Sequence, residues 1–257
     1  MAVELSLDNK VALITGGSRG IGAETVRLFT RAGARVVFNY RVASEQAQAL
    51  AAECGGPEQC HAVQGELGSA QEGRAIVEQA VAIWDRLDAL VVNHGIWPAH
   101  DASIDSMADA QWRGTMGINL DSVFGLVQAA VARFKAQGNG GHVVLVASTA
   151  AQRGEAFHAD YAASKGALIS LTKSLSSELA GEGIAVNCVA PGWVATDMSA
   201  PALATEASRA KIFSTIPMGR VGTPAEIAAP ILFLCTPWAG FISGEVVNVN
   251  GGAVLVG

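Results

Sequence analysis

Short apolar runs alternate with longer amphipathic segments along most of the chain. The runs are rich in Val, Ile, Leu and Ala, which is typical of buried strands. They span residues 11–14, 36–38, 62–64, 89–92, 143–146, 185–189 and 246–249. In the segments between them, apolar residues recur at spacings of three and four, which indicates helices. These segments span residues 23–32, 44–53, 74–84, 122–137, 162–180 and 225–234. The alternation predicts repeated strand–helix–strand units.

The predicted strands are apolar throughout rather than at every second position. A strand needs this when neither face meets water, as in a parallel sheet covered by helices on both sides. We therefore expect an α/β fold of the Rossmann type, a doubly wound parallel sheet of about seven strands with helices on both faces. No linker or fixed-period repeat interrupts the pattern, so residues 1–257 are expected to form a single domain. A helical stretch over residues 196–216 breaks the rhythm and is a candidate mobile lid.

The composition argues against several classes of protein. Half of the 257 residues are hydrophobic, so the chain can bury a core without a metal or a disulfide. The formal net charge is −6 and the 17 Lys and Arg residues are dispersed, which disfavours nucleic acid or an anionic membrane as a partner. The four cysteines have no CxxC or metal-ligand spacing, so reduced thiols and no metal site are expected. The start lacks a basic segment followed by an apolar one, and no apolar run reaches about 18 residues, which indicates a cytoplasmic protein.

Glycine and small polar residues follow four of the predicted strands. The segments are Thr15-Gly-Gly-Ser-Arg-Gly-Ile-Gly22, Asn93-His-Gly95, Ser148-Thr149 and Pro191-Gly-Trp-Val-Ala-Thr196. In an open parallel sheet, ligands bind beyond the carboxyl ends of the strands, where the strand order reverses. A glycine-rich turn that leads into a helix lets the backbone approach a pyrophosphate and directs free N–H groups at it. The first segment therefore predicts a dinucleotide site built on Gly16, Gly20 and Gly22.

The end of the second predicted strand bears on which dinucleotide would bind. NAD-binding folds usually place an acidic residue there, which bonds the free 2′-hydroxyl of the adenosine ribose. This chain has Phe38-Asn-Tyr-Arg41 and no carboxylate. Arg41 and Arg19 could both reach a 2′-phosphate, so NADP(H) is favoured. The alternative is that both arginines are solvated surface charges; Asn39 could bond a free ribose, so NAD(H) stays open as the cofactor.

Tyr161 is one of two tyrosines and lies four residues before Lys165, on nearly the same face of a predicted helix. An exposed Tyr/Lys pair is common, so the spacing alone does not decide. Ser148 follows the fifth strand, however, and the crevice should receive all three side chains. A phenol has an ordinary pKa of about 10, and a nearby ammonium lowers that pKa by stabilising the phenolate. We expect Tyr161 to protonate a carbonyl oxygen that Ser148 binds, while hydride arrives from a nicotinamide.

These motifs resemble those of the short-chain dehydrogenase/reductase family over essentially the full length of the chain. The family's glycine motif corresponds to residues 15–22, its active-site pair to Tyr161-Ala-Ala-Ser-Lys165, and its serine to Ser148. The resemblance implies that Asn119 holds a water in a proton relay to Lys165. It also implies that residues 191–196 hold the nicotinamide carboxamide and that residues 244–252 include the last strand.

The residues and the resemblance together predict a complete site. The catalytic residues are Ser148, Tyr161, Lys165 and Asn119. The cofactor-binding residues are Gly16, Ser18, Arg19, Gly20, Ile21, Gly22, Arg41, Glu66, Leu67, Asn93, Gly95, Tyr161, Lys165, Pro191, Gly192, Val194 and Thr196.

Two positions depart from the family's pattern. The family usually has Asn-Ala-Gly after the fourth strand, whereas His94 replaces the alanine here and brings a titratable ring to the expected cofactor path. A structural histidine is the favoured interpretation. Glu66 stands where the family usually has an aspartate near adenine, and its longer carboxylate can serve the same contact.

The loops expected to border the pocket offer large apolar walls and a few polar groups, which suits a carbonyl compound with an apolar portion. The candidates are Trp97, Gln152, Glu155, Phe157, His158, Trp193 and Met198. Trp97 and Trp193 could equally have a structural role and pack their loops against the core. Three further segments are Phe38-Asn-Tyr40, Met218-Gly-Arg-Val-Gly222 and Asn250-Gly-Gly252. In these segments the chain most resembles the 3-oxoacyl-(acyl-carrier-protein) reductases of the family. The same segments also occur in the family's reductases of sugars and xenobiotic ketones.

The predicted function is NADP(H)-dependent hydride transfer between a ketone and a secondary alcohol, with a 3-oxoacyl-thioester as one candidate substrate. The alternatives are a small apolar ketone or a sugar, and, from another class, a dinucleotide-sensing protein without turnover. No catalytic residue is missing, which argues against the sensor. Arg133 and Lys135 are the candidate basic pair for docking an acyl carrier protein. Family members are commonly tetramers, so a homotetramer through the helices at 122–136 and 162–180 is expected.

Overall fold

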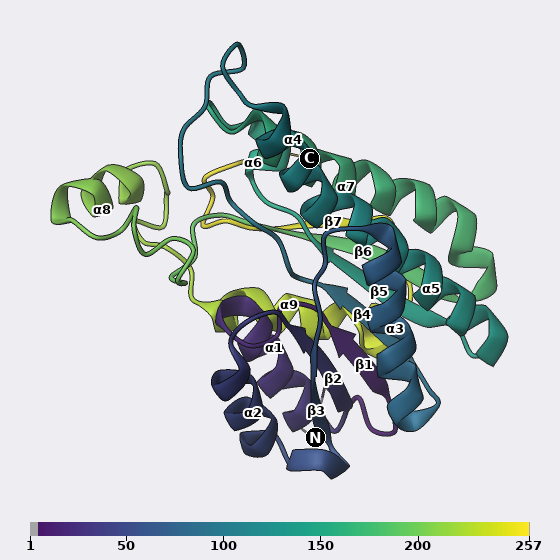
Figure 1. Ribbon diagram of the computed structural model, residues 1–257. Helices are drawn as coiled ribbons and strands as arrows, with labels where there is room; N and C mark the ends of the chain where they lie inside the picture. The colour runs from purple at the N-terminus through teal and green to yellow at the C-terminus, as the bar shows by residue number, and fades with distance from the viewer. Residues whose placement is uncertain (1–4, 257) are drawn as a thin grey trace.

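One parallel sheet of seven strands forms the centre of the computed structural model, which describes residues 5–256 (Figure 1). The strands are β1 (Val11–Ile14), β2 (Arg35–Tyr40), β3 (Cys60–Gln64), β4 (Ala89–Val92), β5 (Gly141–Val146), β6 (Ile184–Pro191) and β7 (Val246–Val249). Their order is β3-β2-β1-β4-β5-β6-β7, and every neighbouring pair is parallel. The chain therefore builds outward from β1 to β3 and then returns to β4 on the other side of β1. The predicted doubly wound parallel sheet is confirmed.

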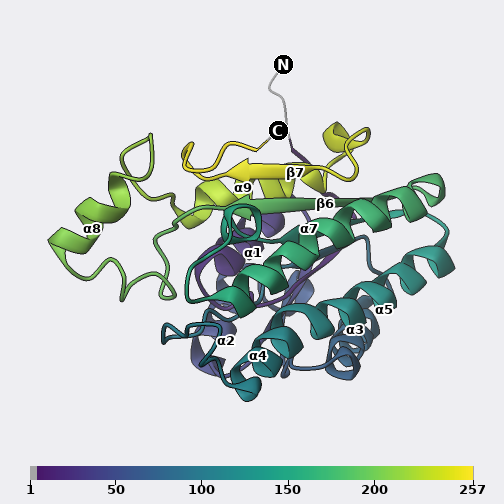
Figure 2. The same cartoon turned by 90° about the horizontal axis from the view of Figure 1, so that it is seen from above.

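Helices cover both faces of this sheet (Figure 2). The α-helices are α1 (Gly20–Arg31), α2 (Ser44–Glu53), α3 (Ala70–Trp84), α4 (Asp109–Met116), α5 (Ser122–Gln137), α6 (Ala150–Arg153), α7 (Ala159–Leu179), α8 (Glu206–Phe213) and α9 (Pro224–Leu234). Three short 3₁₀ turns, η1 (Gly56–Glu58), η3 (Ala180–Glu182) and η4 (Pro237–Ala239), and one π-helical turn, η2 (Gly117–Asp121), complete the elements. Helices α1, α2 and α9 lie on one face, and α3, α5 and α7 lie on the other.

Each face of the sheet has its own apolar core. Phe29 of α1 and Ile231 of α9 belong to one core, and Phe134 of α5 and Leu168 of α7 belong to the other. Neighbouring residues of one strand point to opposite cores, as Ile14 does to the first and Leu13 to the second. This arrangement is the physical reason for strands that are apolar at every position.

Helices α3 and α5 pack closely because each has a glycine at the contact. A Cβ on Gly73 would collide with the carbonyl oxygen of Ser122, and a Cβ on Gly125 would collide with that of Ala70. The backbones can approach only without these side chains. The contact fixes the start of α5 and the π-helical turn η2 just before it.

The predicted strands at 11–14, 89–92 and 246–249 match the structure at both ends, and the other four extend by one or two residues at one or both ends. The helical stretch expected within residues 196–216 is α8, which has no buried residue. Helix α4 was not predicted. It joins η2 and α5 in a continuous stretch, Asp109–Gln137, whose length and apolar composition alone would suffice to cross a membrane; half of its most apolar window is buried inside the fold, as in a core helix.

Candidate active site

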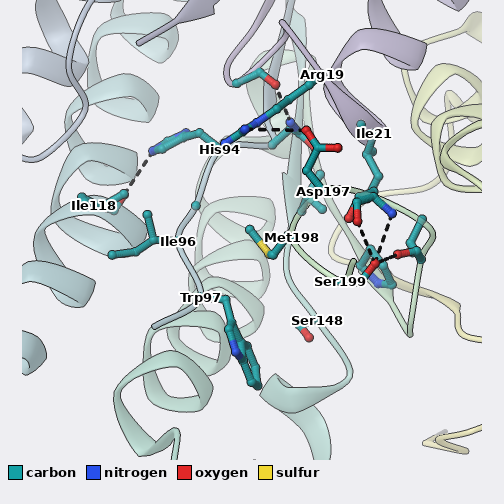
Figure 3. A pocket seen from close by; sticks show the side chains of 18 of the residues that line it. Arg19, Ile21, His94, Ile96, Trp97, Ile118, Ser148, Asp197, Met198 and Ser199 are labelled. Atoms are coloured by element: carbon teal, nitrogen blue, oxygen red, sulfur yellow. Dashed lines mark hydrogen bonds and ion pairs between the residues drawn. The ribbon is translucent and has the colours of Figure 1, made fainter. Parts of the chain in front are cut away.

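A cleft of about 400 Å³ opens at the carboxyl edge of the sheet, where the strand order reverses between β1 and β4 (Figure 3). All but one of the residues expected to bind a cofactor line it: Gly16, Ser18, Arg19, Gly20, Ile21, Arg41, Glu66, Leu67, Asn93, Gly95, Tyr161, Lys165, Pro191, Gly192, Val194 and Thr196. The exception is Gly22, which closes the turn behind the wall. A Cβ there would collide with the carbonyl oxygen of Gly16.

The glycine turn after β1 presents backbone donors to the cleft. Gly16 and Gly20 have φ angles of 61° and 55°, in the left-handed region that favours glycine. Helix α1 begins at Gly20, its N-cap residue Arg19 makes no side-chain cap, and its first turn holds no acidic residue. The first N–H groups and the positive end of the helix are therefore available to an anion. The turn fits the pyrophosphate of a dinucleotide.

Asn93 at the end of β4 fixes the shape of this turn. Its Nδ2 donates to the carbonyl oxygens of Thr15 and Gly16, both at 3.1 Å. The side chain thus bridges the two central strands across the point where their order reverses. A role in shaping the glycine turn accounts for an asparagine at this position.

His94 links the same two strand ends to the turn η2. Its Nε2 lies 3.1 Å from the carbonyl oxygen of Ile118 and 2.8 Å from Ser122 Oγ, and its Nδ1 lies 2.8 Å from Thr15 Oγ1. A carbonyl oxygen can only accept, so Nε2 carries the proton and Nδ1 accepts from Thr15. Burial, together with the charge of Lys165, lowers the pKa of His94 to about 3. The ring is neutral, and these contacts agree with the structural interpretation.

Ser148 and Tyr161 meet at one wall of the cleft. Ser148 follows β5 and Tyr161 lies in the first turn of α7, and their hydroxyl groups are close enough for Ser148 to lower the pKa of Tyr161. Tyr161 is 8% exposed. Two hydroxyl groups are thus held together where a carbonyl oxygen could accept from both.

Lys165 lies one turn after Tyr161 and is buried. Its Nζ donates to the carbonyl oxygen of Val146 at 2.9 Å. Burial lowers the pKa of Lys165 to about 8. Below that value the ammonium form prevails, so a positive charge stands beside the cleft at neutral pH.

The prediction that Lys165 brings the pKa of Tyr161 below 10 is wrong for this structure. Burial raises the pKa of Tyr161, the hydrogen bond with Ser148 offsets part of that rise, and the negative charge of Glu155 adds to it. The desolvation of a phenolate outweighs the favourable contact because the side chain is almost fully enclosed. Tyr161 is therefore a neutral phenol at neutral pH.

Asn119 lies in η2 and is fully buried. Its Oδ1 accepts from the N–H of Ile96 at 2.8 Å, and its Nδ2 donates to the carbonyl oxygen of Ile96 at 3.0 Å and to Ser164 Oγ at 3.1 Å. A Cβ on Gly95 would lie 3.2 Å from this Oδ1 and 3.1 Å from Lys165 Nζ. Asn119 and Lys165 thus meet at the loop that follows β4, and this asparagine holds that loop in place.

The two arginines expected to bind a 2′-phosphate both line the cleft and are exposed. Arg19 lies 3.6 Å from a carboxylate oxygen of Asp197, and Arg41 lies 3.9 Å from one of Glu66. Both distances are at the long end for an ion pair, and both side chains are more than half exposed. Neither guanidinium is held so firmly that it could not turn to a phosphate.

Comparison with known proteins agrees with this geometry. A solved structure from Brucella melitensis, described as a short-chain dehydrogenase/reductase and as glucose/ribitol dehydrogenase, is similar with a TM-score of 0.90 and 35% identity, covering 99% of this chain and 100% of that one. A family profile described as Enoyl-(Acyl carrier protein) reductase matches residues 16–254. The chain belongs to the short-chain dehydrogenase/reductase family. It is therefore an oxidoreductase.

Two further relatives of this short-chain dehydrogenase/reductase cover nearly its whole length. A 3-oxoacyl-[acyl-carrier-protein] reductase of Synechocystis sp. is 37% identical over 255 residues, which are 97% of this chain and 99% of the relative. A blue fluorescent protein from a metagenomic library, solved in complex with NADPH, has a TM-score of 0.88 and 34% identity and covers 97% of this chain and 100% of that one.

On the substrate side of the cleft, four of the seven predicted residues line it: Trp97, Glu155, Trp193 and Met198. The other three do not. Gln152 donates to Asn248 Oδ1, and Phe157 is 55% exposed. His158 is buried, stacks on Trp97 with ring centroids 4.0 Å apart and bonds the carbonyl oxygen of Pro98 at 3.1 Å, so it supports the wall from behind.

Several lining residues of this short-chain dehydrogenase/reductase were missed by sequence reasoning. They include Ile96 and Ile118 beside Asn119, Ala202 in the 196–216 segment, and Arg153 at the end of α6. Within residues 5–256, no cluster of three His, Cys, Asp or Glu side chains could hold a metal ion.

Proposed function

We propose that this protein catalyses reversible, NADP(H)-dependent hydride transfer between a ketone and a secondary alcohol. The observation that carries the proposal is that Ser148 and Tyr161 line the same cleft as the glycine turn, with Lys165 one helical turn away. A non-catalytic dinucleotide sensor would have no need for this arrangement.

In this proposal each catalytic side chain has one task. Ser148 and Tyr161 donate hydrogen bonds to the carbonyl oxygen, and Tyr161 transfers its proton as the alkoxide develops. When bound, the nicotinamide supplies the hydride for reduction or accepts it in oxidation. The Lys165 ammonium supplies a positive charge near the phenolate that remains, although burial keeps the pKa of Tyr161 above its ordinary value. Asn119 holds the loop after β4 in place beside Lys165. A water between Asn119 and Lys165 would complete the proton relay.

The preference for NADP(H) rests on Arg19 and Arg41. Both line the cleft, Arg19 in the glycine turn and Arg41 just after β2, and the strand end itself, Asn39 to Arg41, holds no carboxylate for a free ribose hydroxyl. Asn39 uses its Nδ2 on the carbonyl oxygen of Gly65 at 3.0 Å, which weakens its candidacy for the ribose of NAD(H). The NADPH bound to the metagenomic relative points in the same direction.

The remaining features of the proposal concern the whole chain. It would act as a single NAD(P)-binding domain and as a cytoplasmic homotetramer. The segment 196–216 would be a lid, because its first residues, among them Thr196 and Met198, line the cleft while α8 has no buried residue.

The surroundings of Arg133 and Lys135, the candidate pair for docking an acyl carrier protein, bear on the choice of substrate class. Arg133 is paired with Asp85 and Lys135 with Glu182, each at 2.7 Å. Little free positive charge is left there for an acidic carrier. A small ketone or a sugar is therefore the better candidate, although the Synechocystis relative is a 3-oxoacyl-[acyl-carrier-protein] reductase.

The decisive test is Tyr161→Phe. Removing the phenolic proton should lower turnover by about 10²-fold or more, the usual scale for general acid catalysis. Binding of NADPH, followed by its fluorescence, should change little because the ring stays in place. Unchanged turnover in this variant would show that another group donates the proton.

A further inference from the structure

An ion pair stands beside the proposed catalytic hydroxyls. Arg153 Nη2 donates to Glu155 Oε2 at 2.5 Å, and both residues line the cleft together with Ser148 and Tyr161. The Glu155 side chain is 25% exposed and that of Arg153 is 45% exposed. The pair is thus open to a ligand in the cleft rather than sealed in the core.

The turn that carries the pair has a fixed backbone. Gly154 has φ 76° and donates to the carbonyl oxygen of Ala150 at 3.0 Å, and Glu155 accepts from His158 N at 3.2 Å. Phe157 has φ 64°, a left-handed conformation that costs free energy for a side chain of this size. Its carbonyl oxygen accepts from Ala102 N at 3.0 Å, which ties the turn to the loop before α4. Such a backbone holds Arg153 and Glu155 at the cleft.

Glu155 acts against the catalytic group beside it. Its negative charge raises the pKa of Tyr161 and so opposes formation of the phenolate. Arg153 neutralises part of this charge. A carboxylate in this place is therefore better explained by the substrate than by the proton transfer itself.

We propose that Arg153 and Glu155 form a subsite for the hydroxyl groups of a polyhydroxylated substrate, a sugar or a sugar alcohol. The inference rests on the proposed hydride transfer and names its substrate class. A guanidinium only donates and a carboxylate only accepts, whereas a hydroxyl does both. Two neighbouring hydroxyl groups can therefore bond Arg153 and Glu155 together without separating the ion pair.

The same pair disfavours an acyl thioester with a long apolar chain. A methylene chain lying on Arg153 and Glu155 would remove water from two charges and return no hydrogen bond. Trp97 and Trp193, which line the same cleft, offer apolar surface to the carbon skeleton of a sugar. The cleft thus combines ring surface with a donor and an acceptor, as a polyol requires.

The test is a substrate panel followed at the nicotinamide absorbance, with NADP⁺ and NAD⁺ for oxidation and the reduced forms for reduction. The polyols are ribitol, D-glucitol, D-mannitol, D-glucose and L-rhamnose; cyclohexanol is the alcohol without further hydroxyl groups, and acetoacetyl-CoA is the thioester. We expect kcat/KM for at least one polyol to exceed that for cyclohexanol and acetoacetyl-CoA by about tenfold or more, the scale of one hydrogen bond to a charged group.

The variants Glu155→Gln and Arg153→Met separate substrate binding from proton transfer. Each should raise KM for the preferred polyol about tenfold while KM for cyclohexanol stays within about twofold. Glu155→Gln also removes a charge near Tyr161, so it should change kcat for both alcohols alike. Glu182→Gln is the matched control, because it breaks an ion pair with Lys135 outside the cleft.

The results of these experiments distinguish failure of the polyol subsite from failure of the proposed hydride transfer. A preference for cyclohexanol or acetoacetyl-CoA, or equal KM changes for polyol and cyclohexanol in the variants, would overturn the polyol subsite and leave hydride transfer standing. If no compound of the panel reacts with either cofactor, the proposed function itself fails and the subsite fails with it.

Discussion

His94 is held as a neutral ring between three backbone segments. Thr15 donates to its Nδ1, and its Nε2–H faces Ile118 and Ser122 of the helical stretch that carries Asn119. A proton added to Nδ1 would point at Thr15 Oγ1. That oxygen already accepts hydrogen bonds from the backbone N–H groups of Asn93 and His94. The low pKa of His94 therefore has consequences for stability.

The predicted consequence is a loss of stability in mild acid. The unfolded histidine has a pKa near 6.5 and the folded one about 3, so between these values the unfolded chain binds a proton that the folded chain does not. Stability then rises with pH, and about 1–2 kcal/mol should be lost between pH 7 and pH 5 through this residue. Urea denaturation of His94→Gln should show a pH dependence smaller by that amount.

The control for this prediction is His100→Gln, because His100 is exposed. Its pH dependence should equal that of the wild type. His142, whose pKa is also lowered by burial, is present in all three proteins and cancels in the comparison. Equal slopes for wild type and His94→Gln would contradict a neutral, tightly held His94.

Arg41 is predicted to set the cofactor preference. Arg41→Ala should raise KM for NADPH about tenfold, because one charge-assisted contact to the 2′-phosphate is lost, and should leave KM for NADH nearly unchanged. Arg113→Ala, which removes an exposed arginine paired with Asp109, is the control. A wild-type enzyme that prefers NADH would refute the role assigned to Arg41 and Arg19.

The sequence alone located the residues that belong to recognisable motifs, but it did not give the direction of every side chain near the site. Ser148 was located because it follows a predicted strand, and Tyr161 because it lies four residues before Lys165 on a predicted helix. Gln152 contacts Asn248 instead of lining the cleft, and Phe157 is exposed on a turn where its own φ is left-handed. The direction of the Tyr161 pKa also depends on burial, which residue spacing does not reveal.

Helix α4 shows why an element can be missed. Its sequence, Asp-Ala-Gln-Trp-Arg-Gly-Thr-Met, has no apolar stripe, and Thr115 is its one buried residue. It is held instead by polar contacts, in which Thr115 and Gln111 donate to the buried carboxylate of Asp160 at 2.8 and 3.2 Å. Asp160 in turn accepts from the N–H of Tyr161 at 2.9 Å. Contacts between distant residues form this element, and hydrophobic periodicity does not record them.

The segment 196–216 is predicted to close on the bound ligands. Helix α8 stands away from the body of the protein (Figures 1 and 2) and buries no residue, whereas Thr196 and Met198 at the start of the segment line the cleft. Ligands that bind these residues should hold the segment. Cleavage by trypsin after Arg209 or Lys211 should slow by roughly fivefold when NADPH and substrate are both present.

The control for the lid is a trypsin site elsewhere. Cleavage after Arg113, an exposed residue of α4, should keep its rate when ligands are added. If ligands leave the cleavage rates at Arg209 and Lys211 unchanged, the segment does not act as a lid. If they slow cleavage at all three sites alike, ligands stabilise the whole protein rather than the lid.

Across the whole molecule, the order of strands does most to assemble the site. Residues separated by more than 140 positions, such as Gly16 and Tyr161, meet because β1, β4 and β5 are adjacent and parallel. The sequence predicted the parallel sheet from its apolar strands, and the common edge followed from parallelism. The position of α5 against α3 required the close contact at Gly73 and Gly125, which no local pattern indicates.

Assembly into a tetramer is predicted to depend on Phe124 of α5. Phe124 on α5 is 53% exposed although its neighbours Val123 and Leu126 are buried, so an aromatic ring faces outward from a helix expected at a subunit interface. A charge at an aromatic position that becomes buried in an interface typically costs about 2 kcal/mol or more of binding free energy. Sedimentation velocity should give four times the mass of one chain for the wild type and a smaller species for Phe124→Asp. Ile104→Asp, which alters an equally apolar but more exposed loop residue, should leave the tetramer intact, and a monomeric wild type would refute the assembly.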